Sequence, residues 1–156
     1  MATFDKYDPI SGGFRAKLKT ALTLTNGEFF GAVSIDNTGR AIAGFAAGAG
    51  SRLAGITVKK VARQATGAWG TSPYAGTPNP AFPIGALAGD VIDIMTAGEI
   101  VDLDKAVFVA GTRFYAKPTG AIVAEGASAA GDVPIGFTVE AGRLIVRYAV
   151  GTPAKA

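Results

Sequence analysis

The chain has 156 residues, of which 49% are hydrophobic and 17% are charged, so it can form one packed domain or two very small ones, and disorder is excluded. It contains no cysteine and no histidine, which excludes disulfides, thiolate chemistry, histidine-based triads and His or Cys metal sites. The net charge is +3, but residues 1–78 carry nine Lys or Arg against four Asp or Glu, whereas residues 79–156 carry six against eight. This asymmetry indicates either an acidic partner or solvated strand faces.

Residues 1–14 show no periodicity and predict an extended N-terminal arm. They include the aromatic residues Phe4, Tyr7 and Phe14, which need burial either in the core of this chain or on a partner. Arg15, Lys17 and Lys19 follow directly. We therefore predict that the three aromatics and the three basic residues contact a partner protein or a neighbouring subunit, with the cations facing acidic groups. No basic and apolar leader pattern follows Met1, so we expect no signal peptide.

Residues 15–65 predict the first half of a single β-rich domain that spans residues 15–150. Polar and apolar residues alternate from Arg15 to Leu24, and the run stops at a turn formed by Asn26 and Gly27. The rest of this half predicts a strand over 29–35, a turn over 36–39, a weakly specified strand over 41–50 and a further strand over 53–61.

Residues 66–85 predict a long loop rich in proline, glycine and aromatic residues. Four prolines interrupt this uncharged stretch, which rules out a membrane-spanning helix, and no membrane partner is expected. Trp69 and Tyr74 are candidate contact residues within it. They are suited either to stacking in a glycan or peptide groove or to plugging one end of a barrel.

Residues 86–150 predict a C-terminal β meander of three hairpins, with turns at 97–98, 117–120 and 141–142. In the last strand, Leu144 and Val146 alternate with arginines, as in a half-buried strand. The fold class is therefore all-β, a small antiparallel β-barrel or sandwich. Residues 151–156 are predicted to form a flexible tail.

Five carboxylates are close in sequence, but they alternate with apolar residues and predict solvated strand faces rather than a site. A glycosidase pair and a calcium site remain the alternatives. These carboxylates are Asp90, Asp93, Glu99, Asp102 and Asp104. Neither a cofactor nor a metal ion is predicted, and the chain is not expected to be an enzyme, because the usual acid–base groups at neutral pH are missing.

Phosphate and nucleic-acid motifs are weak. Residues 44–50 read G-x-x-x-G-x-G, but no Gly-Lys-Ser/Thr closes the motif and no helix pattern follows. Arg113–Lys117 is the one stretch that interleaves basic and aromatic residues. One such run does not support a nucleic-acid partner, and none is predicted.

Five segments of the C-terminal region together resemble the decoration, or cement, proteins of tailed-bacteriophage capsids. The resemblance covers roughly the last 65 residues, and its motifs are structural turns rather than catalytic signatures. The segments are Ala88–Ile94, Thr96–Val101, Ala110–Ala116, Pro134–Val139 and Gly142–Arg147.

This resemblance implies a "β-tulip"-like domain over Gly85–Val150 and a structural virion protein that binds the outside of an assembled capsid. The implied partners are the major capsid protein and two further copies of the chain in a homotrimer, and the implied location is the capsid exterior. Glycan or peptide binding in a phage tail, fibre or head-surface module is the alternative function. Neither reading includes catalysis.

Overall fold

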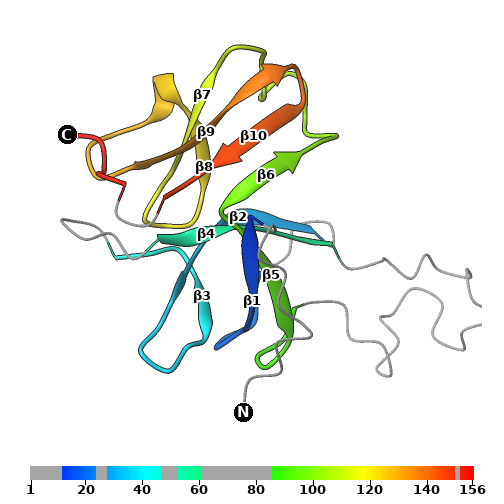
Figure 1. Cartoon of the computed structure of the whole chain (residues 1–156), viewed down its shortest axis with the longest axis vertical. Coiled ribbons are helices and arrows are strands. Elements are labelled where there is room, and N and C mark those ends of the chain that lie inside the picture. The colour runs from blue at the N-terminus through cyan, green and yellow to red at the C-terminus, as the bar shows by residue number, and fades with distance from the viewer. Residues whose placement is uncertain (1–11, 24–27, 47–52, 61–85, 150–151) are drawn as a thin grey trace, which may run out of the picture.

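The computed structural model describes residues 12–23, 28–46, 53–60, 86–149 and 152–156, which form two five-stranded antiparallel sheets (Figure 1). The predicted all-β class is confirmed, and the only helix in these residues is the single 3-10 turn η2 (Glu125–Ala127). The loop over 66–85 and most of the N-terminal arm lie outside the described residues.

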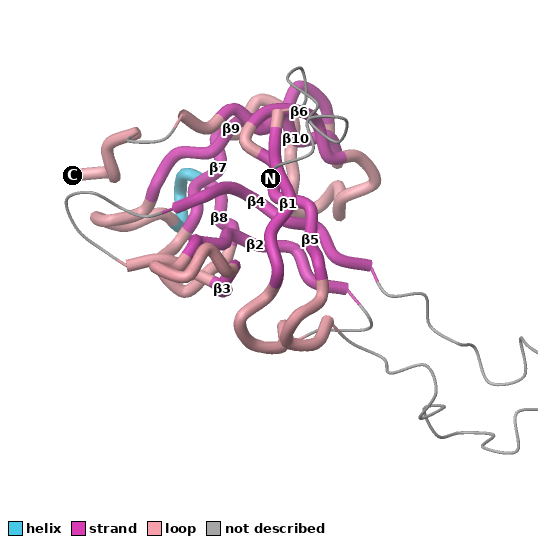
Figure 2. The backbone as a smooth tube through the Cα atoms, turned by 60° about the horizontal axis from the view of Figure 1, so that its bottom comes forward, coloured by secondary structure: helices cyan, strands magenta, loops and turns pink. Residues whose placement is uncertain are grey.

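Each sheet takes its strands from distant parts of the chain. The first sheet has the order β1 (Gly13–Lys17), β5 (Val91–Met95), β4 (Leu53–Lys60), β2 (Glu28–Ile35) and β3 (Ala41–Ala43). The second has the order β6 (Ala97–Ile100), β10 (Arg143–Arg147), β9 (Val133–Glu140), β7 (Arg113–Ala116) and β8 (Ile122–Ala124). Figure 2 shows β1 beside β5 and β2 beside β4.

Two of the three predicted C-terminal hairpins are confirmed, namely β7–β8 and β9–β10. The predicted hairpin with its turn at 97–98 is wrong. Strand β5 pairs with β1 and β4, whereas β6 pairs with β10 in the other sheet. The chain crosses between the sheets at Thr96, whose backbone N–H and hydroxyl both donate to the Gly12 carbonyl and whose own carbonyl accepts from Tyr148 N at 2.7 Å. The C-terminal region is therefore not a meander, and the two sheets do not match the two predicted halves.

Both ends of the described chain are hydrogen-bonded to the sheets. The predicted arm included Phe14, but Gly13 and Phe14 already pair with β5, so any arm ends before Gly12. At the other end, Lys155 N donates to Asp132 O at 2.7 Å, and Gly131 N donates to Lys155 O at 2.8 Å. Residues 152–156 are thus attached to the start of β9 rather than forming the predicted flexible tail.

The first sheet curls until its two edges meet. Leu18, just after β1, forms a parallel bridge with Ala41 of β3, and Lys19 N donates to Ala41 O at 2.9 Å. The hollow of the curl is filled by small and aliphatic side chains. Its buried members are Leu18, Leu22, Val33, Ala41, Ala86, Ile92 and Ile94.

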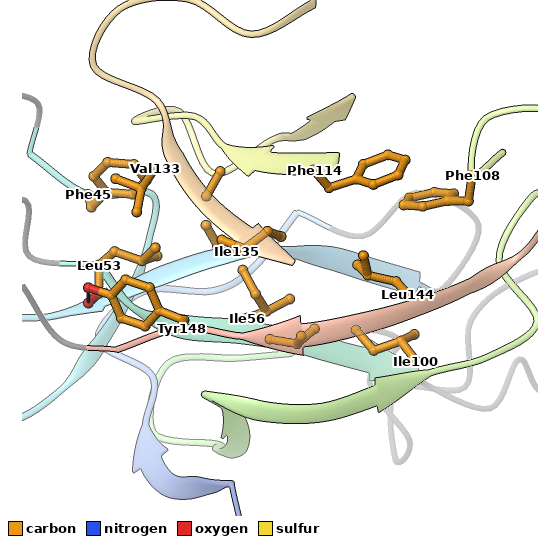
Figure 3. Packing of buried hydrophobic residues seen from close by; sticks show 13 residues of the cluster. Phe45, Leu53, Ile56, Ile100, Phe108, Phe114, Val133, Ile135, Leu144 and Tyr148 are labelled. Atoms are coloured by element: carbon orange, nitrogen blue, oxygen red, sulfur yellow. Dashed lines mark hydrogen bonds between the residues drawn. The ribbon is translucent and has the colours of Figure 1, made fainter. Parts of the chain in front are cut away.

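A second core lies between the two sheets and contains the larger side chains (Figure 3). Phe108 stacks on Phe114 with ring centroids 4.6 Å apart, in the offset geometry that aromatic pairs favour. The hydroxyl of Tyr148 donates to the Leu53 carbonyl at 2.7 Å, which ties the end of the second sheet to β4. Leu144 and Val146 are fully buried here, as their alternation predicts.

The sheets also meet through direct backbone contact, which glycine makes possible. The turn between β7 and β8 bonds to the first sheet twice, since Ala32 N donates to Gly120 O at 2.8 Å and Phe45 N donates to Pro118 O at 2.9 Å. Gly44 sits in this joint with a φ of +78°, and a Cβ there would lie 2.4 Å from the Pro118 carbonyl oxygen. The joint therefore requires glycine for both its conformation and its space.

We predict that Gly44→Ala destabilises the fold far more than Gly39→Ala. Both glycines have almost the same φ, +78° and +77°, but nothing lies within 4 Å of a Cβ at Gly39. Gly39→Ala should cost about 1–2 kcal/mol for the left-handed backbone alone. Gly44→Ala should cost a further 1–3 kcal/mol or so for the clash. Urea unfolding of the two variants measures the difference, and equal losses would show that the joint tolerates a side chain.

Candidate functional site

Four of the eight predicted contact residues lie in the described part of the chain: Phe14, Arg15 and Lys17 in β1, and Lys19 just after it. Phe4, Tyr7, Trp69 and Tyr74 lie outside the described residues. The described four follow one edge of the curled sheet. The structure therefore places them along one strand but does not test whether they contact a neighbour.

The β1 surface combines an exposed aromatic side chain with a charge pair. Phe14 is 44% exposed, and Arg15 Nε lies 2.7 Å from Asp93 Oδ1 on the neighbouring strand β5. Because both charged side chains are largely in solvent, this pair adds little stability. Lys17 is exposed and stands opposite Val91, which is itself half exposed. Of the basic residues in β1, only Lys17 lacks a carboxylate partner within the described residues.

Lys19 is also paired within the chain. Its Nζ lies 3.0 Å from Asp36 Oδ2, while Asp36 Oδ1 accepts from Arg40 N, Thr38 N and the Thr38 hydroxyl at 2.7–2.9 Å. The Arg40 backbone bond has the largest effect, followed by the Thr38 hydroxyl and Lys19, and together they hold the pKa of Asp36 far below its usual range. Lys19 thus fixes the turn between β2 and β3.

This depressed pKa predicts a specific pH dependence of stability. Asp36 binds its proton more weakly in the folded than in the unfolded state, so it stabilises the fold in full above the unfolded pKa of about 3.9. That contribution is lost as the pH falls from about 4 toward the lower folded pKa. Asp36→Asn should therefore be less stable than the wild type at pH 7, and the gap should narrow between pH 4 and pH 2 in chemical unfolding. A difference in unfolding free energy between wild type and Asp36→Asn that does not change with pH would contradict this role of the Asp36 carboxylate.

The sequence-clustered carboxylates are spread over different turns and strands. Asp90 Oδ2 accepts from Leu87 N, and Asp104 Oδ1 accepts from Ala106 N, so both close local turns. Glu99 bonds Arg143 across β6 and β10. Within the ranges that the structure describes, no three Asp or Glu residues are grouped to hold a metal ion. These carboxylates therefore lie in separate turns and on separate strand faces and are not gathered into one site.

The aromatics of Arg113–Lys117 are not available for base stacking. Phe114 is completely buried and Tyr115 is 8% exposed. Lys155 lies over the Tyr115 ring, with Nζ 5.6 Å from its centroid. The one stretch with a nucleic-acid-like pattern thus directs its rings into the protein, and Arg113 is the only exposed residue of β7.

The second sheet has an exposed surface that the sequence did not predict. We call this surface the outer face. It is centred on Phe137 of the middle strand β9, a side chain that is 45% exposed. Directly opposite Phe137 stand Ile145 of β10 and Arg113 of β7. Arg147 lies two residues beyond Ile145 on the same face of β10. The sequence carried no signal for the outer face, because Val133, Ile135, Phe137 and Val139 alternate as the residues of one buried face do.

The carboxylates on the outer face neutralise only one of its arginines. Arg143 bonds Glu99 Oε2 through Nε at 2.8 Å and through Nη2 at 2.6 Å, and it reaches Glu140 at 3.4 Å. These two carboxylates, Glu99 first, raise the pKa of Arg143 above its usual value. Arg113 and Arg147 are exposed and have no carboxylate within ion-pair distance among the described residues. The outer face therefore combines an apolar centre with two arginines that lack a carboxylate partner, and its three arginines outnumber its two carboxylates.

No protein-family model matches the chain, and no curated protein sequence is significantly similar to it. In the part of the chain that the structure describes, no helix has the length and apolar character needed to span a membrane.

Proposed function

We propose that this chain is a structural virion protein that binds the outer surface of an assembled tailed-phage capsid and stabilises it, without catalysis. The observation that carries the proposal is the resemblance of the five C-terminal segments to capsid decoration proteins. In the structure those segments form β5, β6, β7, β9 and β10 with their turns. A resemblance carried by strands and turns rather than by a pocket suits a protein whose role is to present a surface.

The distribution of exposed apolar side chains supports a role in association. Large apolar residues are exposed on both sheets, in the turn before β5 and on the loop over 101–112, and exposed apolar surface is a common feature of association sites. They are Phe14, Val58, Leu87, Val91, Val101, Val107, Val109, Phe137 and Val139. Contacts with a shell and with neighbouring copies would cover a part of these positions, and many copies on one lattice would reinforce one another through avidity.

We predict that the purified chain co-sediments with mature shells of the phage that encodes it and raises the temperature at which the shells break open. Shells incubated without the protein are the baseline. A glycan array probed with the same sample tests the alternative function. Binding to a glycan without binding to shells would replace the capsid proposal with that of a receptor-binding module.

We also propose that the chain assembles as a homotrimer, because a threefold-symmetric ring would bury apolar surface that the monomer exposes. Light scattering of the purified protein at micromolar concentration should give three times the chain mass of 15.7 kDa. The same measurement repeated on shell-bound and released protein shows whether assembly depends on the shell. A monomeric mass in both samples would contradict the trimer.

A further inference from the structure

We propose that the outer face of the second sheet is the docking surface for the capsid, and that it receives an apolar side chain flanked by Asp or Glu on the capsid protein. This inference rests on the proposed function and adds to it the surface and the chemistry of its partner. The surface is defined by Phe137 and Ile145 with Arg113 and Arg147.

The register of the strands places these side chains in one compact cluster. Phe137 on β9 stands between Ile145 on β10 and Arg113 on β7, with directly opposite Cβ atoms about 5 Å apart. Arg147 occupies a diagonal position about 7–8 Å from Phe137, since it follows Ile145 by two residues. Figure 1 shows β9 in the middle of its sheet, between β10 and β7. An exposed aromatic on a central strand is thus bordered by cations on both sides.

The charges on this face argue for an acidic partner. Arg143 is already neutralised by Glu99 and Glu140, whereas Arg113 and Arg147 have no carboxylate partner in the described chain. A partner that covers Phe137 would bring its own groups against these two guanidiniums. Leaving them buried and unpaired would be costly, so the partner must supply carboxylates at both positions.

The same charges argue against a twofold pairing of this face with itself. A twofold pairing of two outer faces would bring Arg113 and Arg147 of one copy toward those of the other, and like charges at close range weaken association. Aromatic and arginine side chains together are typical of the energetic centre of protein interfaces. The face therefore fits an acidic protein surface better than a twofold pairing with the same face of another copy.

The test measures the affinity of wild type and variants for mature shells of the encoding phage, used as the probe. Phe137→Thr removes the ring but keeps a residue suited to strands, and Arg113→Glu combined with Arg147→Glu reverses both free charges. Each variant should bind at least tenfold more weakly than the wild type. The wild type should lose affinity as salt rises from about 50 to 500 mM, and the double charge variant should lose this dependence.

Two matched controls carry the same chemical changes in turns next to the first sheet, away from the outer face. Leu87→Thr removes an apolar side chain that is 44% exposed, close to the 45% of Phe137, and Arg40→Glu reverses an exposed charge. Both should bind shells within about twofold of the wild type. Melting temperatures of all variants show whether the fold is intact. We expect an intact fold, because the substituted side chains are exposed.

The remaining outcomes separate this inference from the proposed function. If wild type binds shells but Phe137→Thr and the double charge variant bind equally well, the outer face is not the docking surface and the capsid function stands. Loss of binding in Phe14→Thr and Lys17→Glu alone would assign docking to β1. Conversion of a trimer to a monomer by Phe137→Thr would show that a second copy covers the face. If wild type binds no shells, or binds DNA instead, both the function and the inference are wrong.

Discussion

Strand β2 is buried on both of its faces, and the rest of the structure depends on this constraint. Its residues point alternately into two different cores, so Val33 packs inside the curl of the first sheet while Ala32 faces the second sheet. Both are fully buried, and one strand thereby joins two small cores that would each be marginal alone. Small side chains at Gly31 and Ala32 let the turn of the second sheet approach the backbone closely.

Local features of the fold could be predicted from the sequence, whereas the partners of distant strands could not. The hairpins β2–β3, β7–β8 and β9–β10 follow from turn residues between two alternating runs. The crossing at Thr96 was mistaken for a hairpin because Ala97 and Gly98 have turn composition. In the structure they form the start of β6, and the contact that fixes the crossing is to Gly12, 84 residues earlier. Such a contact leaves no periodic signal near either residue.

The candidate site shows the same division between local pattern and long-range pairing. The sequence correctly places Arg15 and Lys17 on a strand, but it does not show that Arg15 and Lys19 are paired with Asp93 and Asp36. The outer face was missed for a related reason. A bulge in β9 opposite β7 shifts the register between Phe114 and Tyr115, so the strand does not keep one alternation along its length. The pairing of β9 with its neighbouring strands then determines which of its apolar residues face solvent.

The rigidity of the outer face follows from the way in which the second sheet is fixed to the first. Backbone bonds from Ala32 and Phe45 hold the β7–β8 turn, and the Tyr148 hydroxyl holds the end of β10 against Leu53. Phe137 and Arg113 are therefore mounted on strands whose positions are already set before any partner arrives. Binding would order only the side chains themselves, which reduces the entropy lost on association. A surface built in this way can bind through few contacts, which is the requirement of a protein that acts by covering a lattice in many copies.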